Sequence, residues 1–282
     1  MMYQFPKPFL KWAGGKTQLL DQFTPLYPRE FVAYHEPFVG SGAVYFHLNS
    51  LKLKGTLNGS MSRIYLTDRN DELVNCYRVV QDSVDEVIKV LTKHKRRHSA
   101  EYYYQVRSQP PAHLNRVERA ARLIYLNKTC FNGLYRVNRD GQFNVPMGRD
   151  KNPTILDEGR LRSVSLALQA VQIRYASFKE VVNTAKAGDF IYFDPPYHPL
   201  NKTSNFTSYT ENNFGEAEQR ELADVFRQLD RQGCQVMLSN SSSPFVSRLY
   251  AEFKRQRVKA SRLINAQAQK RGKISELVIL NY

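Results

Sequence analysis

Short runs rich in β-branched and aromatic residues alternate with helical segments along much of this chain of 282 residues. The runs occupy residues 34–38, 64–67, 190–193, 236–238 and 277–280. Strands that alternate with helices usually lie side by side in a parallel sheet, because each helix carries the chain back to the edge where the next strand begins. The pattern therefore predicts an α/β fold with a largely parallel sheet.

The middle of the chain has a different pattern. Residues 215–232 repeat apolar positions at helical spacing and are followed by Gly233, so they form one clear helix between two of the predicted strands. Between residues 71 and 159, helical patterns follow one another without a strong strand between them. We therefore expect a helical domain, residues 71–159, inserted between two parts of the sheet domain, residues 1–70 and 160–282.

The chain is strongly basic, with 41 Lys and Arg against 26 Asp and Glu and a formal net charge of +15. Such an excess is typical of nucleic-acid binding, because Lys and Arg displace the counterions condensed on phosphates. A soluble basic protein without a polyanionic partner would carry the same charge, so the charge alone leaves both readings open. The basic run 93–98, which the pattern puts between two helices, could contact phosphate, but such a run more often forms a solvated surface.

Other features of the composition argue against several classes of protein. No apolar run approaches the ~20 residues that a membrane-spanning helix requires. Pro6 and Pro8 interrupt the stretch where a signal peptide would be apolar, so we expect a cytoplasmic protein. Cys76, Cys130 and Cys234 are far apart in the sequence, which argues against a disulfide framework and against a metal site. We expect each cysteine to be buried and no metal to be bound.

The sequence Asp194-Pro195-Pro196-Tyr197 directly follows the predicted strand 190–193. Active sites of open α/β sheets lie beyond the carboxyl ends of their strands. Proline has no N–H, so the carbonyl of Pro195 can point outward and accept a hydrogen bond together with the Asp194 carboxylate. An amine that donates to both acceptors becomes a better nucleophile, and Tyr197 offers a ring face on which a base can stack. A tight turn at the strand end is the structural alternative.

A glycine turn follows the first predicted strand, where Gly40 and Gly42 allow a cofactor to approach the backbone closely. The turn alone would be weak support for a cofactor site. The second predicted strand, however, ends next to Asp68, and α/β nucleoside sites use a carboxylate in this position to bind ribose hydroxyls. Near the amino terminus, Trp12 lies between Lys11 and Lys16 in a third motif, which by itself would be read as a buried tryptophan beside solvated lysines.

In this order, the three motifs resemble those of the DNA adenine-N6 methyltransferases of the Dam type, in which the glycine motif precedes a recognition insert and Asp-Pro-Pro-Tyr follows it. Residues 132–138 and 141–149 resemble the recognition loop of these enzymes, and Ser239-Asn240 resembles a later strand end. The resemblance covers nearly the whole chain. It implies a Rossmann-like catalytic domain, an inserted target-recognition domain, S-adenosyl-L-methionine as the only cofactor, and a flipped adenine in double-stranded DNA. No membrane and no obligate protein partner is implied.

The resemblance also implies roles for individual residues. The expected catalytic residues are Asp194, Pro195, Pro196 and Tyr197. The expected cofactor-binding residues are Trp12, Lys16, Phe38, Gly40, Gly42, Asp68, Ser177, Phe178 and Asp194. The expected DNA-binding residues are Lys11, Phe131, Asn132, Arg136, Asn138, Pro146 and Arg149. Arg136 is expected to read a guanine, with GATC as the recognised sequence. Phe131 stands where relatives can carry tyrosine, so a hydroxyl contact is lost there while stacking remains.

Three alternatives stay open at this point. An RNA adenine methyltransferase would share both the charge and the chemistry, and a DNA-binding protein of methyltransferase ancestry would share the fold. A protein glutamine methyltransferase would use a related motif that usually opens with asparagine. Cytosine-C5 chemistry needs a nucleophilic cysteine, typically after proline, and none of the three cysteines follows proline. Asp194 and the large insert favour DNA adenine methylation.

Overall fold

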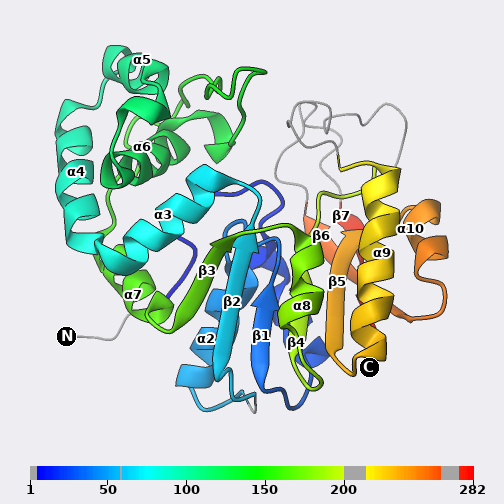
Figure 1. The fold of residues 1–282 in the computed structure, drawn as a ribbon. Coiled ribbons are helices and arrows are strands. Elements are labelled where there is room, and N and C mark those ends of the chain that lie inside the picture. The colour runs from blue at the N-terminus through cyan, green and yellow to red at the C-terminus, as the bar shows by residue number, and fades with distance from the viewer. Residues whose placement is uncertain (1–4, 58, 200–213, 262–272) are drawn as a thin grey trace.

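The structure, a computed structural model, describes residues 5–57, 59–199, 214–261 and 273–282. These residues form one 7-stranded sheet with strand order β3-β2-β1-β4-β5-β7-β6 (Figure 1). The strands are β1 (Ala33–Glu36), β2 (Arg63–Asp68), β3 (Val171–Tyr175), β4 (Phe190–Phe193), β5 (Gln235–Ser241), β6 (Lys254–Ser261) and β7 (Lys273–Leu280). The ladders from β3 to β5 are parallel, and β7 is antiparallel to both β5 and β6. The expected α/β fold with a largely parallel sheet is therefore confirmed.

Each predicted strand is present, and two strands were not expected. β1 stops at Glu36, short of the expected end, because Pro37 cannot donate to the ladder. β3 is an edge strand in which only Val171 and Ile173 are buried, so its sequence does not form a continuous apolar run. β6 is the opposite edge and begins Lys-Arg-Gln-Arg. Charged side chains protect exposed sheet edges from further pairing, and they hide such strands from a search for apolar runs.

Helices cover the two faces of the sheet and extend beyond one end of it. They are α1 (Leu20–Phe23), α2 (Ala43–Leu53), α3 (Asp71–Asp82), α4 (Val84–Arg97), α5 (Ala100–Ser108), α6 (Arg116–Thr129), α7 (Glu158–Leu168), α8 (Val181–Thr184), α9 (Glu216–Arg231) and α10 (Pro244–Leu249), with short 3-10 turns η1 (Lys16–Leu19), η2 (Thr24–Leu26), η3 (Pro111–His113), η4 (Phe131–Gly133) and η5 (Phe178–Glu180). The helix predicted for residues 215–232 is α9 and is confirmed. None of the helices in the described part of the chain combines the length and apolar character that a bilayer crossing requires.

Alternation along the central strands divides the core into two layers. In β4, Phe190 and Tyr192 face the layer that contains α2, whereas Ile191 and Phe193 face the layer that contains α9. Successive side chains of a strand point to opposite faces of the sheet, and in β4 both sets are apolar. This is the pattern of a sheet that is covered by helices on both faces. Both layers are needed to bury β4. Because β4 is held from both faces, Asp194, which follows it, has a fixed position at the edge of the sheet.

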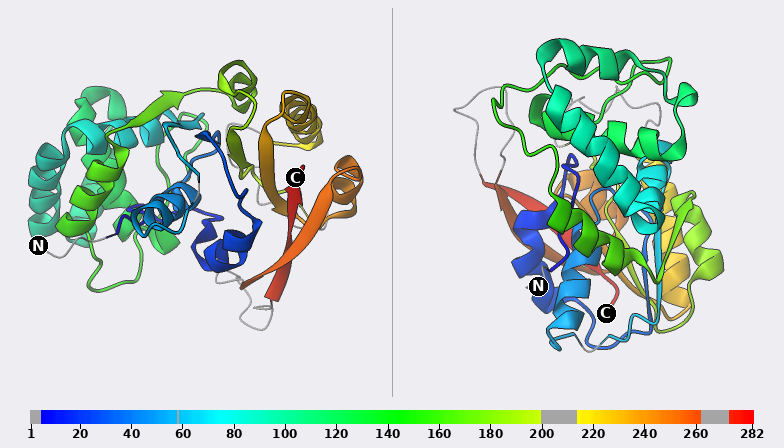
Figure 2. Two further views of the ribbon diagram at one scale, coloured as in Figure 1. Left: turned by 90° about the horizontal axis from the view of Figure 1, so that it is seen from below. Right: turned by 90° about the vertical axis from the view of Figure 1, so that its left-hand side faces the viewer.

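Helices α4, α5 and α6 form a group beyond the carboxyl ends of the strands, on the β3 side of the sheet (Figures 1 and 2). Asn115 is the N-cap of helix α6. Its side chain accepts from the backbone N–H of Glu118, and the carboxylate of Glu118 accepts from the N–H of Asn115. This capping box defines the start of the helix. The interior of the group is continuous with the layer of the core that covers one face of the sheet. The division at residues 71 and 159 remains our prediction.

The basic run 93–98 lies in a different kind of segment from the one predicted. Residues 93–97 lie in the last turns of α4 rather than between helices, and only His98 lies beyond the helix as its C-cap. His94 is buried, with its ring stacked on Tyr125 at 4.8 Å between centroids and its Nδ1 2.9 Å from the hydroxyl of Tyr102. Cations at a helix C-terminus interact favourably with the helix dipole, which gives these side chains a role within the helix itself.

The order of the strands determines where a ligand site can form. β1 lies between β2 and β4, so the chain reverses its direction of travel across the sheet at the boundary between β1 and β4. Crevices open at such a switch point, beyond the carboxyl ends of the two strands. The glycine turn follows β1 and Asp194 follows β4, so both motifs border this point.

The turn between β1 and α2 depends on a glycine that no other residue can replace without cost. Gly42 has φ +66°, and a Cβ at this position would lie 2.8 Å from the hydroxyl of Tyr77. We expect Gly42→Ala to lower the free energy of unfolding by about 2 to 4 kcal/mol, through left-handed strain and overpacking together. Gly55, which has φ +69° and open space within 4 Å of the point where a Cβ would lie, is the control. Gly55→Ala should cost only about 1 kcal/mol. Equal losses of stability in urea titrations of the two variants would contradict the steric part of this argument.

Candidate active site

The glycine turn is held by contacts from three other parts of the chain. The N–H of Gly40 donates to Oδ2 of Asp68 at 3.2 Å, and the carbonyl of Gly40 accepts from the hydroxyl of Tyr77 at 3.1 Å. The ring of Trp12 lies directly against Gly40, so that a Cβ there would approach its Cδ1 to 2.9 Å. The backbone of the turn therefore has a fixed shape, and its glycines let neighbouring side chains approach it closely.

Asp68 is the last residue of β2 and lies beside this turn. Its Oδ1 accepts from the N–H of Asn70 at 3.0 Å, while its Oδ2 holds Gly40. Burial raises the pKa of Asp68 to about 6, against the opposing effect of the backbone hydrogen bonds that it accepts. Close by, the rings of Phe38 and Phe178 stack at 5.4 Å between centroids. Ser177 caps the short turn that carries Phe178, accepting from the N–H of Lys179.

Asp194 follows β4 and forms an ion pair with Lys16. The distance between Lys16 Nζ and Asp194 Oδ1 is 2.8 Å, and the side chains are 4% and 20% exposed. The ammonium also donates to the carbonyl of Gly14 at 2.5 Å. Burial raises the pKa of Asp194 to about 6, although Lys16 opposes this shift, and the carboxylate of Glu276 adds to it. The site thus holds a carboxylate with its counterion in a poorly hydrated setting, where electrostatic interactions are strong.

Tyr197 is fixed at both ends of its side chain. Its hydroxyl donates to Oε2 of Glu276 in β7 at 2.6 Å, and Lys16 Nζ lies 4.7 Å from the centre of its ring. Burial, followed by the negative charges of Asp194 and Glu276, holds the pKa of Tyr197 well above its usual value. Pro195 is buried and Pro196 is exposed. The four residues of the predicted catalytic motif therefore lie together at the edge of the sheet.

Glu36 is a buried acid in the glycine motif for which the sequence alone indicates no role. It is 2% exposed, and its Oε2 accepts from the hydroxyl of Tyr34 at 2.8 Å and from the N–H of Tyr45 at 3.1 Å. Burial raises the pKa of Glu36 to about 8, and the carboxylates of Asp194 and Asp68 contribute to the increase. Tyr45 lies in the first turn of α2, whose N-cap is Gly42 and has no side chain. Glu36 supplies the capping acceptor that glycine lacks.

The amino-terminal motif contacts both the glycine turn and the loop after α6. Trp12, besides touching Gly40, stacks on Tyr135 at 5.4 Å between ring centroids. The backbone of Lys11 is held by Asn127 of α6, which accepts from its N–H at 2.8 Å and donates to its carbonyl at 2.6 Å. The same Asn127 amide donates to the carbonyl of Gly133 at 3.0 Å. Lys11 is thus anchored by its backbone, and its side chain remains exposed.

The loop after α6 carries most of the predicted DNA-binding residues. Phe131 is 41% exposed, and its N–H donates to the carbonyl of Pro146 at 2.9 Å, which brings the two ends of the loop together. Asn132 and Gly133 both have positive φ, as expected of a tight Asn-Gly turn. Arg136 is exposed, and its Nε donates to Oδ1 of Asn144 at 2.6 Å.

The other predicted DNA-binding residues lie in the same loop. Asn138 accepts from the backbone of Asp140 and Gln142 on its side-chain oxygen, at 3.0 and 2.8 Å. Its side chain therefore shapes the tip of the loop. Arg149, by contrast, is exposed at the end of the loop. The predicted catalytic and cofactor residues come together around the switch point, whereas these residues form a separate surface connected to it through Trp12.

Sequence motifs did not identify several residues that hold the site. Glu276 reaches Tyr197 because β7 pairs with β5, and no local pattern indicates this long-range pairing. Gln219 donates to the carbonyl of Pro196 at 2.9 Å. Gln219 could have been noticed in the sequence, because this polar residue continues the apolar stripe that Leu222, Phe226 and Leu229 form in α9.

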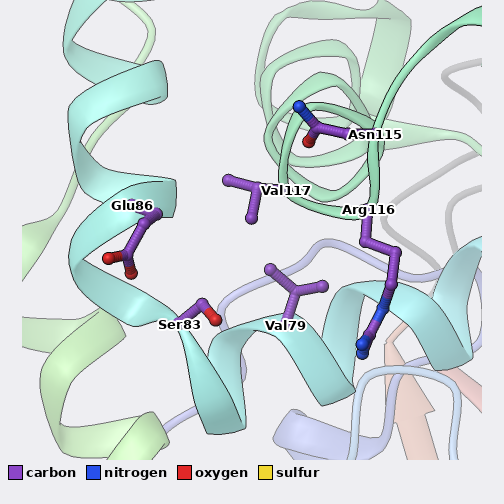
Figure 3. A pocket seen from close by; sticks show the side chains of 6 residues that line it. All are labelled: Val79, Ser83, Glu86, Asn115, Arg116 and Val117. Carbon is purple, nitrogen blue, oxygen red and sulfur yellow. The ribbon is translucent and has the colours of Figure 1, made fainter.

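Of two cavities, the larger lies outside this constellation, whereas Glu36 and Ser177 help to line the smaller one. A depression of about 580 Å³ lies where α3, α4 and the start of α6 meet (Figure 3). Val79 and Val117 lie in its middle, with Ser83 and Glu86 to one side and Arg116 to the other. A smaller cavity of about 40 Å³ lies on the α8 side of the sheet and is lined in part by His35 and Tyr65. In the described ranges, no group of His, Cys, Asp and Glu side chains could hold a metal ion.

The chain is similar to known DNA methyltransferases over nearly all of its length. Residues 12–264 match the family described as D12 class N6 adenine-specific DNA methyltransferase. Type II methyltransferase M1.LlaDCHI of Lactococcus lactis subsp. cremoris is 44% identical, over 98% of this chain and 95% of the relative. Type II methyltransferase M.MjaIII of Methanocaldococcus jannaschii is 45% identical, over 98% of this chain and 99% of the relative. DNA adenine methylase of Escherichia coli strain K12 is 34% identical, over 97% of this chain and 95% of the relative.

The raised pKa of Glu36 has a measurable effect on stability. The carboxyl group of Glu36 binds its proton more tightly in the folded state than in the unfolded state. The free energy of unfolding therefore decreases as the pH rises from the ordinary pKa of a glutamate to about 8. We expect Glu36→Gln, a neutral isostere, to remove this dependence. The free energy of unfolding of the wild type should fall relative to that of the variant by up to about 1.4 kcal/mol per pH unit in this window. Parallel stability curves between pH 5 and about 8 would contradict burial of a neutral Glu36.

Proposed function

We propose that this chain, which belongs to the D12 class of N6 adenine-specific DNA methyltransferases, transfers a methyl group from S-adenosylmethionine to N6 of an adenine flipped out of double-stranded DNA. The observation that carries the proposal is the arrangement of Asp194 and Tyr197 beyond β4. A partly buried carboxylate and an aromatic ring held by Glu276 lie there, in the loop that carries the carbonyl of Pro195 and next to the glycine turn. Extruding a base from the stack gives access to its exocyclic amine, which lies out of reach inside a duplex.

The residues around the glycine turn fit S-adenosylmethionine. The oxygens of Asp68 accept from the backbone N–H groups of Gly40 and Asn70, and a carboxylate has further lone pairs that can accept from ribose hydroxyls. The stacked rings of Phe38 and Phe178 offer an apolar surface for an adenine ring. The residues proposed to hold the cofactor are Trp12, Lys16, Phe38, Gly40, Gly42, Asp68, Ser177, Phe178 and Asp194. When bound, S-adenosylmethionine would supply an electrophilic methyl group on a sulfonium centre.

Asp194 and Pro195 prepare the attacking nitrogen. The target amine donates one hydrogen bond to the Asp194 carboxylate and one to the carbonyl of Pro195. Lys16 engages Oδ1 of Asp194, and the second carboxylate oxygen can receive the amine. Two in-plane acceptors favour a nitrogen whose lone pair is withdrawn from the purine ring and is available to bond the methyl carbon. The electron pair of the C–S bond would then return to sulfur, and one amine proton would be released to water. Fixed acceptors in a poorly hydrated site need no reorganisation during the reaction, which is the main source of their effect on rate.

Tyr197 positions the target base against these acceptors. The base stacks on the ring, whose hydroxyl is tied to Glu276 and cannot turn away. Lys16 Nζ lies over the same ring and donates to Gly14 and Asp194, so it occupies part of this surface before a base arrives. The ammonium must therefore shift, or remain at the edge of the ring, when the base binds.

The loop after α6 and the amino-terminal motif form the proposed DNA-binding surface. The residues proposed to contact DNA are Lys11, Phe131, Asn132, Arg136, Asn138, Pro146 and Arg149. Phe131 is an exposed aromatic at the start of this loop and can fill the space that a flipped adenine leaves. The net charge of +15 would supply the sequence-independent part of the affinity. GATC is the proposed recognition sequence.

The catalytic proposal is tested by one assay of methyl transfer. Labelled methyl from S-adenosylmethionine should appear as N6-methyladenine in duplexes that contain GATC, with much less in duplexes that lack it. Asp194→Ala should lower kcat by about 100- to 1000-fold while leaving the fold intact, because one of the two acceptors for the amine is lost. Asp82→Ala, at an exposed position in α3, is the control. A near-normal kcat for the Asp194 variant would refute its role, and label in RNA alone would favour the RNA alternative.

The reading of guanine by Arg136 is tested separately. The planar guanidinium can donate to both O6 and N7 of guanine, a pattern of acceptors that no other base presents in the major groove. Arg136→Ala should then lose about 1 to 3 kcal/mol of discrimination at one base pair and begin to methylate sites altered there. Arg139→Ala, at the exposed tip of the same loop, is the control. If kcat/KM falls equally on GATC and on all its single-base variants, Arg136 contacts phosphate instead.

A further inference from the structure

Two buried amide side chains lie directly behind the loop that carries Tyr197. Gln219 belongs to α9 and Asn240 to β5, and both are 0% exposed. Buried amides are costly unless their donors and acceptors are satisfied. The functional motifs identified in the sequence do not include Gln219, and they include Asn240 only as a strand end.

The two amides form a chain of hydrogen bonds that begins and ends in the same loop. The N–H of His198 donates to Oδ1 of Asn240 at 3.2 Å. Nδ2 of Asn240 donates to Oε1 of Gln219 at 2.9 Å, and Nε2 of Gln219 donates to the carbonyl of Pro196 at 2.9 Å. Because the first group is an N–H and the last is a carbonyl, only one orientation of the two amides satisfies every contact.

The backbone of this loop is not held by the hydrogen bonds of a helix or a sheet. Residues 194–199 belong to no helix or strand, and Pro195 and Pro196 have no N–H to donate. The amide chain grips the backbone on both sides of Tyr197, at the carbonyl before it and at the N–H after it. Glu276 holds the far end of the same side chain. The backbone and the ring of Tyr197 are therefore fixed from three elements: α9, β5 and β7.

We propose that Gln219 and Asn240 are positioning residues for methyl transfer, which set the carbonyl of Pro195 and the ring of Tyr197 in the orientation that receives the target amine. The inference rests on the proposed function of Asp194 and Tyr197. Neither amide touches the reacting atoms in this arrangement, because both act through the backbone of the loop. Their loss should lower kcat and leave the KM values for S-adenosylmethionine and DNA nearly unchanged, since the glycine turn and the DNA-binding loop lie elsewhere.

The first test removes both contacts of Gln219. In the full-length protein, Gln219→Leu should reduce kcat by about 10- to 100-fold, as expected for the loss of buried hydrogen bonds that orient a reacting group. Gln228→Leu, an exposed glutamine on the same helix, is the control and should keep the activity of the wild type. A kcat for Gln219→Leu that matches this control would overturn the inference. An increase in either KM without a change in kcat would overturn it as well.

The second test replaces Gln219 by a residue whose hydrogen bonding depends on pH. It also applies if the Gln219→Leu variant does not fold. In Gln219→Glu, the introduced carboxyl can donate to Pro196 only while it is protonated, so the chain of hydrogen bonds is complete at low pH and broken at high pH. Burial raises the pKa of such a group. The ratio of the kcat of the variant to that of the wild type should therefore fall at least 10-fold between pH 5.5 and about 9.

The nearby titratable groups are present in both proteins and cancel in this ratio. They are Asp194 and His198 in the loop, Glu216 at the start of α9 and Glu276 in β7. A flat ratio across the pH range would overturn the inference, even if the variant is less stable than the wild type. Failure of the proposed function is distinguishable, because in that case the wild type itself would form no N6-methyladenine.

Discussion

Three acidic side chains at the carboxyl ends of adjacent parallel strands, one buried and two partly buried, are the constraint on which the site depends. Glu36 ends β1, Asp68 ends β2 and Asp194 follows β4, and the register of the parallel ladders brings all three to one edge of the sheet. Burial raises the pKa of each, and Asp68 and Asp194 add to the shift of Glu36. So much negative charge can be held in one place only if each carboxyl group has its own partners.

The three acids have different partners, and these partners separate their roles. Glu36, with a tyrosine hydroxyl and a helical N–H, is stable as a neutral group and supports the start of α2. Asp68 is held by backbone N–H groups and keeps the glycine turn in place. Asp194 alone is paired with an ammonium, from Lys16, which favours its ionised form. An ionised carboxylate has acceptors on both oxygens and accepts more strongly than a neutral carboxyl group, so Asp194 is the member of the set best suited to the proposed role of receiving the target amine.

Features set by short segments of sequence could be predicted, and features set by distant pairing could not. The strand before Asp194 and the glycine turn have local signatures, because apolar runs, prolines and glycines act on their own backbone. β6 was missed because edge strands favour charge, and the basic run in α4 was misplaced because its charged residues resemble a connection. Glu276 could not be found, since its contact with Tyr197 follows from the antiparallel return of β7. Gln219 could have been found as a polar residue that continues an apolar stripe.

The side chain of Trp12 contacts both the turn proposed for the cofactor and the loop proposed for DNA. One part of its ring lies against Gly40 in the turn proposed for the cofactor, and the ring also stacks on Tyr135 in the loop proposed for DNA. This arrangement requires that position 40 have no side chain, because a Cβ there would lie 2.9 Å from the indole. The glycine therefore serves two needs at once: a positive φ for the turn and room for the tryptophan. The packing of Trp12 against the backbone of Gly40 and the ring of Tyr135 thus connects the loop proposed for DNA to the edge of the sheet proposed for catalysis.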